Sequence, residues 1–199
     1  MTDARSAQGK IRHLRVLMSY SAAKNTLNPY TRLLSDAIAR AGGEAIDFRW
    51  KTALFGRYDI IHLHWPEHLL RGRRGARRFA VRAAFLLFIA RSRITQTPIV
   101  RTVHNLEPHD PVSGFDKRCL SLVARETDHW ILMNRSVVDP GRSESVIPHG
   151  DYLPWLRDFD RPPSTAAKRD VTRTGMLFFG LIKRYKGVEE LIRAVLDSP

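Results

Sequence analysis

Short apolar runs alternate with segments of helical periodicity along most of the chain. Strand-like runs occur at 14–18, 45–48, 59–64, 99–103, 129–133 and 145–147. Apolar residues at helical spacing lie between them at 30–41, 76–92 and 115–125. The first helix is bounded by Asn28-Pro29, a favourable N-cap and first helical position, and by Gly42-Gly43. The alternation predicts an α/β fold with a doubly wound parallel sheet.

Polar turns follow four of the predicted strands. They are Ser19-Tyr20, His64-Trp65-Pro66-Glu67, His104-Asn105 and Pro148-His149-Gly150. In a doubly wound sheet, ligands bind outside the carboxyl ends of the strands. We therefore expect the four turns to share one rim and to form a ligand site there.

The chain changes character after this unit. Residues 1–156 are predicted to form the first domain, and the polar, proline-containing segment 157–173 is predicted to be an interdomain linker. A buried strand is predicted at 174–180, a basic turn at 181–187 and a helix at 188–196. Because one strand and one helix cannot bury a core of their own, we expect 174–199 to be the truncated start of a second domain.

Charge widens the choice of partners. The formal net charge of +13 over 199 residues admits nucleic acid, anionic lipid or phosphorylated small molecules, although arginine-rich codon usage also produces such an excess. The single cysteine, Cys119, excludes an internal disulfide. The first 13 residues lack the apolar core of a signal peptide, and no apolar run reaches the roughly 18 residues of a membrane span. The expected location is the cytoplasm.

Two histidines near the second turn have a spacing found in some metal sites. His62 and His64 lie two apart on a predicted strand and so point to the same face. No third ligand is defined by the sequence, and no metal site is predicted. The alternative is that both side chains hold neighbouring loops by hydrogen bonds.

The turn after the fourth predicted strand is rich in groups that can move protons. His104 can exchange a proton near neutral pH or bind a sugar hydroxyl. An acid such as Asp110 near a histidine can act as a general base or orient its neighbour. Pro108 and Pro111 also allow a simpler interpretation of this segment, a rigid polar turn.

Several motifs, in this order and spacing, resemble the GT-B glycosyltransferases of the glycogen-synthase-like group. They are TVHN at 102–105, IPHG at 147–150 before the predicted linker, and FGLIKRYKGVEELIRA at 179–194. The segments DIIHLHWPE at 59–67 and NPY at 28–30 resemble bacterial exopolysaccharide enzymes. Those enzymes transfer mannose or a related sugar from a nucleotide diphosphate to a lipid-linked oligosaccharide.

The resemblance implies a Rossmann-like acceptor domain followed by the first strand and helix of a Rossmann-like donor domain. It implies a catalytic role for His104 near the transferred sugar, and we take Glu67 or Asp110 as the candidate catalytic base. The implied donor-phosphate ligands are Lys183, Arg184, Lys186 and Gly187. The residues expected to bind the acceptor are Ser19, Tyr20, Asn28, Tyr30, His64, Trp65, Asn105, His149 and Gly150. No cofactor is expected, and GDP-mannose is one candidate for the donor substrate.

This sequence departs from the family pattern in the donor half. The family often has arginine at the position of Leu181, so Lys183 or Arg184 has to supply that charge. The acidic residues that bind the donor sugar and ribose fall beyond position 199. We therefore expect the chain to be inactive when it is alone.

The arginine-rich helix suggests one more partner. Arginines at 71, 73, 74, 77, 78, 82, 91 and 93 bracket the apolar stretch 79–90. This composition suits an anionic membrane surface, which predicts a peripheral location at the inner face of the membrane. The alternative is a crossover helix packed on the sheet with its arginine ends in water.

Two rival functions stay open on the residues alone. The arginines could bind nucleic acid, although no aromatic platform accompanies Arg71 to Arg78. A metal-dependent hydrolase could use His62, His64, His104 and Asp110. The motifs leave open the sugar, the nucleotide base, the oligomeric state and the stereochemistry of transfer.

Overall fold

The chain forms two compact units, Met1–Phe159 and Asp160–Pro199, which are described separately. The structure is a computed structural model. It describes residues 13–21, 29–70, 75–103, 113–134, 141–153, 178, 182 and 186–197. The predicted linker and both of its boundaries lie outside these ranges, so the predicted domain limits stay predictions.

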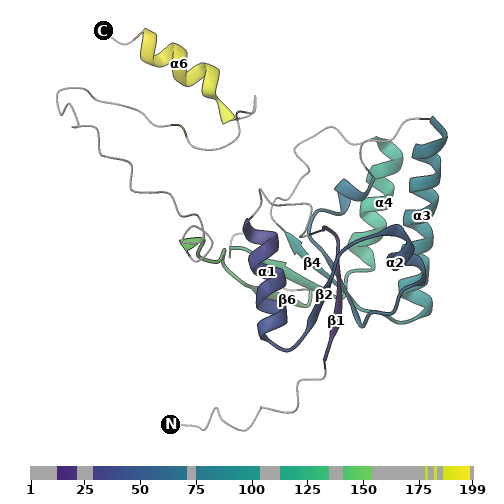
Figure 1. The fold of residues 1–199 in the computed structure, drawn as a ribbon. Helices are drawn as coiled ribbons and strands as arrows, with labels where there is room; N and C mark the ends of the chain where they lie inside the picture. The colour runs from purple at the N-terminus through teal and green to yellow at the C-terminus, as the bar shows by residue number, and fades with distance from the viewer. Residues whose placement is uncertain are drawn as a thin grey trace, which may run out of the picture. The chain divides into compact units, whose positions relative to one another are not determined.

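The first unit is built on a six-stranded sheet in the order β2-β1-β3-β4-β5-β6 (Figure 1). The strands are β1 (Arg15–Met18), β2 (Glu44–Ile46), β3 (Ile60–Leu63), β4 (Ile99–Val103), β5 (His129–Leu132) and β6 (Glu144–Val146). Every neighbouring pair is parallel. This confirms the predicted α/β fold with a parallel, Rossmann-like sheet.

The strand order reverses between β1 and β3. The chain moves from β1 outward to β2 on one side, while β3, β4, β5 and β6 follow one another on the other side. A reversal of this kind opens a crevice at the carboxyl ends of the two central strands, where ligands of such sheets bind. The turns after β1 and β3 therefore flank the expected ligand site.

Helices cover both faces of the sheet. They are α1 (Pro29–Arg40), α2 (Trp50–Phe55), α3 (Gly75–Ile94) and α4 (Gly114–Arg125), with the short 3₁₀ helix η1 (Pro66–Leu69) after β3. The crossover from β1 to β2 places α1 on one face, and α2, α3 and α4 lie on the other (Figure 1). Neither α2 nor η1 was predicted, because helices of six and four residues are too short to show a clear period in the sequence.

Alternate residues of β1 supply the two cores. Leu17 packs in the larger core with Phe85, Phe88 and Ile89 of α3. Its neighbours point the other way: Val16 and Met18 pack in the smaller core beneath α1. Because the side chains of a strand alternate between faces, a strand covered on both faces has an almost continuous apolar sequence.

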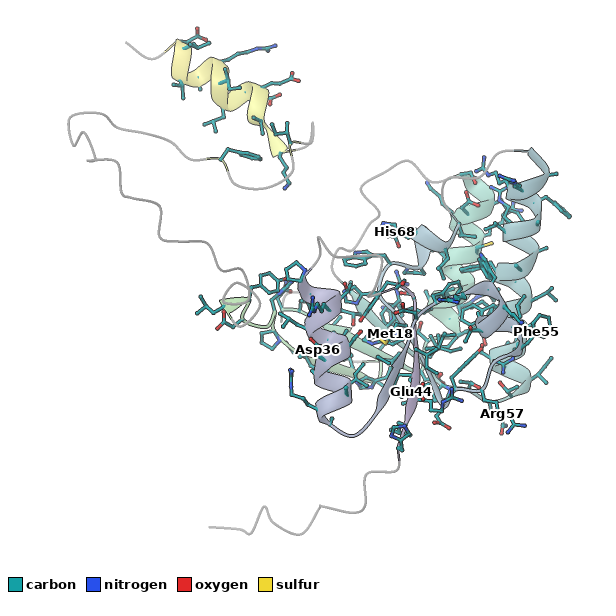
Figure 2. The ribbon with its side chains drawn as sticks, in the orientation of Figure 1. Met18, Asp36, Glu44, Phe55, Arg57 and His68 are labelled. Carbon is teal, nitrogen blue, oxygen red and sulfur yellow. The ribbon has the colours of Figure 1, made fainter. Side chains whose placement is uncertain are left out.

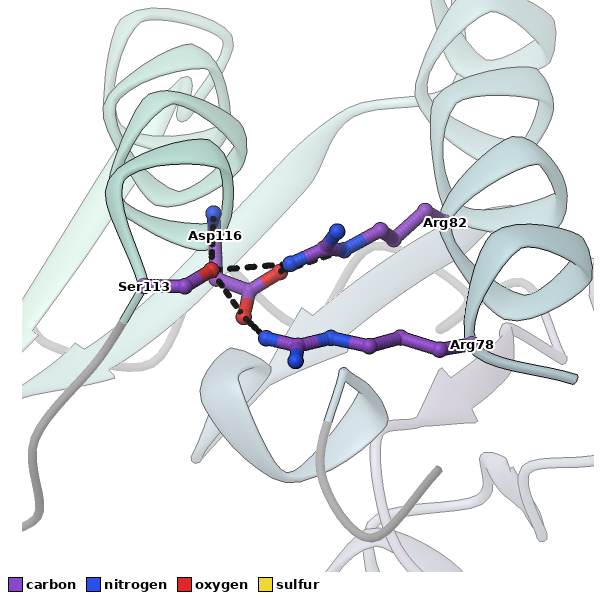
Figure 3. Close-up of polar contacts among 4 residues, drawn as sticks. All are labelled: Arg78, Arg82, Ser113 and Asp116. Atoms are coloured by element: carbon purple, nitrogen blue, oxygen red, sulfur yellow. Dashed lines mark hydrogen bonds and ion pairs between the residues drawn. The ribbon is translucent and has the colours of Figure 1, made fainter. Parts of the chain in front are cut away.

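An ion cluster clamps the start of α4 to α3 (Figure 3). Arg82 Nε donates to Asp116 Oδ1 at 2.9 Å, and Arg78 Nη2 donates to Asp116 Oδ2 at 3.0 Å. Ser113, the N-cap of α4, accepts from the backbone N–H of Asp116 at 3.2 Å and from Arg82 Nη2 at 2.8 Å. Two of the arginines expected to lie on a basic surface thus neutralise a carboxylate that is only 10% exposed.

The cluster controls the ionisation of Asp116. Burial alone would raise the pKa of this carboxyl, but hydrogen bonds from Ser113, Arg82 and Arg78 outweigh it and hold the pKa below its ordinary value. The contribution of the cluster to stability is therefore present above the ordinary aspartate pKa. It is lost as the pH falls through the lowered value.

The second unit contains the helix α6 (Val188–Leu196), which confirms the predicted helix at 188–196. Its N-cap Gly187 has φ 64°, a left-handed conformation that glycine adopts without strain. Apolar Val188, Leu191, Ile192 and Val195 recur at helical spacing. The predicted strand at 174–180 lies outside the described residues except for Phe178.

We predict that Asp116→Ala lowers the free energy of unfolding by about 2–3 kcal/mol, because it removes charged hydrogen bonds and leaves two arginines without their anion. Glu44→Ala serves as the control, since Glu44 pairs with Arg15 at side-chain exposures of 46% and 40%. That change should cost less than about 1 kcal/mol. Urea denaturation measures the free energy of unfolding of both variants. Equal losses would contradict a stabilising role of the Asp116 cluster.

Candidate functional site

Backbone and hydroxyl contacts tie together the turns after the two central strands. Ser19 Oγ accepts from the backbone N–H of His64 at 2.7 Å, and the backbone N–H of Ser19 donates to His62 O at 3.0 Å. Both Ser19 and His64 are buried. The carboxyl ends of β1 and β3 are therefore fixed relative to each other at the point where the strand order reverses.

Tyr20 anchors α1 to the same rim. Its hydroxyl donates to Thr31 O at 3.0 Å and lies 3.4 Å from Ser35 Oγ. Burial raises the pKa of the Tyr20 phenol far above its ordinary value, so the group stays neutral and keeps donating. The side chains of Ser19 and Tyr20 thus lie beneath the rim, and the predicted contact of these two residues with an acceptor stays a prediction.

Tyr30, in the first turn of α1, brings three parts of the chain together. Its ring stacks on His64 at 4.6 Å between centroids, with 24° between the planes. Its other neighbour is His149, which follows β6 and meets the Tyr30 ring edge-on at 4.8 Å. Tyr152 Oη lies 3.0 Å from His149 Nε2. The predicted residues Tyr30, His64 and His149 therefore meet in one cluster.

The aromatic contacts continue beyond His64. Trp65 meets His64 edge-on at 4.3 Å between centroids. His68 of η1 then stacks on Trp65, with 5.7 Å between the ring centroids and 25° between the planes. Figure 2 labels His68, which follows β3. The rim thus carries a row of six rings in which each contacts the next. In order, the row is Tyr152, His149, Tyr30, His64, Trp65 and His68.

A buried polar chain supports the row from below. His62 Nε2 lies 2.8 Å from Thr102 Oγ1, and both side chains are buried. Burial raises the pKa of the Tyr30 phenol, and a hydrogen bond with Thr102 partly opposes the rise. Thr102 therefore links His62 of β3 to Tyr30 of α1. This matches the structural interpretation of His62, a histidine that holds neighbouring segments together.

Acidic groups lie at both sides of the rim. Glu67, a predicted catalytic residue, belongs to η1. Burial lowers the pKa of Arg101, and the negative charge of Glu67 partly opposes this fall. On the far side, Ser21 Oγ donates to Asp47 Oδ2 at 2.5 Å. Asp47 was not among the predicted site residues. Its signal was available, since it is a carboxylate directly after the strand β2.

Several predicted site residues lie outside the described residues. They are Asn28, His104, Asn105, Asp110, Lys183 and Arg184. The strand β4 ends at Val103, next to His104 in the sequence. Gly150 is exposed beside His149. In the second unit, Lys186 Nζ lies 5.9 Å from the centre of the Phe178 ring, and Gly187 begins α6.

The described residues offer no site for a metal. Among them, no group of three or more His, Cys, Asp or Glu side chains is placed to hold a metal ion. His62 and His64 contact other groups of the protein. The cluster at Tyr30 instead has aromatic faces and imidazole nitrogens, which suit a polar ligand with an apolar face, such as a sugar.

Comparison with known proteins relates the chain to a mannosyltransferase. The chain is 34% identical over 183 residues to GDP-mannose:glycolipid 4-beta-D-mannosyltransferase of Xanthomonas campestris pv. campestris. A protein of the same name from strain ATCC 33913 of that pathovar gives the same values. The alignment covers 92% of this chain and 50% of the relative, so the chain spans about half the length of the curated relatives it matches. No family model and no solved structure matches the chain.

The chain has an α/β fold and is similar to part of a glycosyltransferase. The similarity extends over almost the whole chain and confirms the resemblance to glycosyltransferases. The name of the matched relative includes GDP-mannose, a glycolipid and 4-beta-D-mannosyl transfer. The rival nucleic-acid-binding and hydrolase functions receive no support from it.

We predict that Thr102→Val destabilises the protein by about 1–2 kcal/mol, because it removes a buried hydroxyl that bonds to His62 and Tyr30 without changing the volume. The pKa of Tyr30 should rise as well, since the bond that lowers it is gone. Thr95→Val, at an exposed position, is the control. Denaturation together with an NMR titration of Tyr30 checks both effects. An unchanged Tyr30 pKa would contradict the hydrogen bond between Thr102 and Tyr30.

Proposed function

We propose that this chain forms the acceptor-binding half of a GT-B glycosyltransferase that transfers mannose from GDP-mannose to a lipid-linked oligosaccharide. The observation that carries the proposal is the meeting of Tyr30, His64 and His149 where the strand order reverses. The similarity to a glycolipid mannosyltransferase supports the choice of donor and acceptor. A role in exopolysaccharide synthesis would follow from that acceptor.

The proposed chemistry needs three kinds of group. Aromatic and imidazole side chains at the rim hold the acceptor sugar, and Glu67 or Asp110 accepts the proton of its attacking hydroxyl. His104 contacts the transferred sugar. Lys186 and the N–H groups at the start of α6 neutralise the departing diphosphate, with Lys183 or Arg184 supplying a second positive charge. Stabilisation of that developing charge supplies the largest part of the rate enhancement.

The charge of the first unit fits this proposal better than binding to nucleic acid. Arg78 and Arg82 are bound to Asp116. Arg91 donates to Gly56 O at 2.6 Å and to the hydroxyl of Tyr58. These three arginines hold the helices of the larger core together. They are therefore not arranged as a phosphate-binding stripe.

We predict that a longer form of the protein, containing the donor half, releases GDP from GDP-mannose when a glycolipid acceptor is present. His104→Ala should lower kcat at least about 100-fold, the usual scale for loss of a proton-transfer or substrate-contacting group. His129→Ala is the matched control. His129 is the first residue of β5, so it lies at the amino ends of the strands, away from the rim. Full activity of the His104 variant would exclude His104 from the mechanism, and no GDP release by the wild type would contradict the function.

The outer face of α3 supports a second proposed partner, an anionic membrane surface. Phe85, Phe88 and Ile89 face the larger core. Phe79, Leu87 and Ile94 are 77%, 61% and 83% exposed. At 100° per residue these three, with Ala83 and Ala90, form one stripe on the outward side. The helix therefore packs on the sheet and also presents an apolar face to its surroundings.

Charge around this stripe favours a negatively charged partner. No Asp or Glu occurs between His68 and Leu106, while the same segment is rich in arginine. Arg77 on α3 and Arg57 after α2 are exposed, and Phe55, labelled beside Arg57 in Figure 2, is 81% exposed. Apolar side chains flanked by arginines match the boundary between lipid headgroups and acyl chains. Within the described residues, no helix has both the length and the apolar character that a membrane span requires.

We predict that the chain binds vesicles containing phosphatidylglycerol and binds vesicles of pure phosphatidylcholine more weakly. A Phe79→Ser, Leu87→Ser double variant should bind the anionic vesicles at least about tenfold more weakly, because each buried apolar side chain contributes about 1.5–3 kcal/mol. Ile147→Ser, which removes an apolar side chain that is 52% exposed at the far edge of the sheet, is the control. Vesicle flotation measures the binding. Equal binding by the wild type, the double variant and the Ile147 variant would contradict the proposed membrane-binding surface.

A further inference from the structure

The aromatic row has two accessible ends and a buried middle. His64 is 2% exposed and lies between Tyr30 and Trp65. The rings on either side of it are partly or fully exposed. One accessible group is formed by Tyr30, His149 and Tyr152. The other is formed by Trp65 and His68, which we call the Trp65–His68 patch.

The Trp65–His68 patch has a firm support. Pro66 provides the first residue of η1 and is fully buried, and Leu70 at the end of η1 is buried in the larger core. Backbone bonds from His68 N to Trp65 O at 3.0 Å and from Leu70 N to Glu67 O at 3.1 Å close the turn. Since both ends of η1 are anchored, the two rings are held in place without contributing to the core themselves.

The rings of this patch are oriented for stacking. The indole and the imidazole lie within 25° of parallel. Tryptophan combines a large apolar face with one N–H donor, and histidine adds a donor and an acceptor. A sugar ring has one face of C–H groups and a rim of hydroxyls, so it can stack on such rings and bond to their polar edges. Glu67, two residues from Trp65, adds a carboxylate acceptor.

We propose that the Trp65–His68 patch is a second sugar subsite, so that the acceptor glycan spans at least two sugar units. One unit contacts Tyr30, His149 and Tyr152, and the next contacts Trp65 and His68. Buried His64 spaces the two groups by its contacts with Tyr30 and Trp65. This assignment rests on the proposed function, and it makes Trp65 and His68 determinants of acceptor length.

The test compares short and long soluble glycans on this chain. β-1,4-linked mannotetraose is a suitable probe, and mannose is the single-unit comparison. We expect the tetraose to bind at least tenfold more tightly than mannose and to shift both the Trp65 indole N–H signal and the His149 ring signals in NMR spectra. Trp65→Leu and His68→Ala should each remove most of the gain from length.

The variants and controls separate the outcomes. His68 is exposed, so His68→Ala preserves the fold even if Trp65→Leu does not, and thermal unfolding checks both. His129→Ala should bind the tetraose as the wild type does. Equal binding of mannose and tetraose, no binding of either, or an unchanged length dependence in both variants would overturn the second subsite. Titration with GDP alone is also informative, because GDP that shifted the Trp65 signal would assign the patch to a nucleobase and overturn the proposal. GDP release by the longer protein tests the proposed function independently of all these results.

Discussion

The packing of Tyr30 against His64 and His149 is the contact on which the arrangement of the rim depends. It joins the first turn of α1, the end of β3 and the segment after β6, which are distant in the sequence. Tyr20 holds α1 from beneath through Thr31, and Thr102 connects Tyr30 to β3 through His62. Because these groups are buried or partly buried and bonded to one another, the aromatic surface is preformed. A preformed surface loses little conformational freedom when it binds a ligand.

The arginines divide into groups with different physical roles. Arg78 and Arg82 clamp α4 through Asp116, and Arg91 closes the end of α2. Others, such as Arg57 after α2 and Arg77 on α3, are exposed. A net charge of +13 is therefore a sum over structural and surface groups. Only the exposed group is available to a partner, and an anionic membrane surface is the partner proposed for it.

The parallel sheet could be predicted because its central strands, such as β1 and β3, are covered on both faces and so form apolar runs that end in polar turns. The positions of His64 and His149 at one rim followed from that topology. The contact made by Tyr30 did not, since a residue in the first turn of a helix gives no sign of which strand end it meets. Asp47 and His68 were missed for a related reason. The predicted strand 45–48 included Asp47, whereas β2 ends at Ile46 and leaves Asp47 in the turn that follows. His68 lies in a helix of one turn, which shows no clear period.

The central claim is that Tyr30 joins the turns after β3 and β6 in solution. A nuclear Overhauser experiment on the chain, with Tyr30 assigned through Tyr30→Leu, tests it directly. The account predicts cross-peaks from the Tyr30 ring to the imidazole protons of both His64 and His149. A Tyr30 ring in contact with neither histidine would contradict it, and the acceptor site placed at this rim would then be wrong.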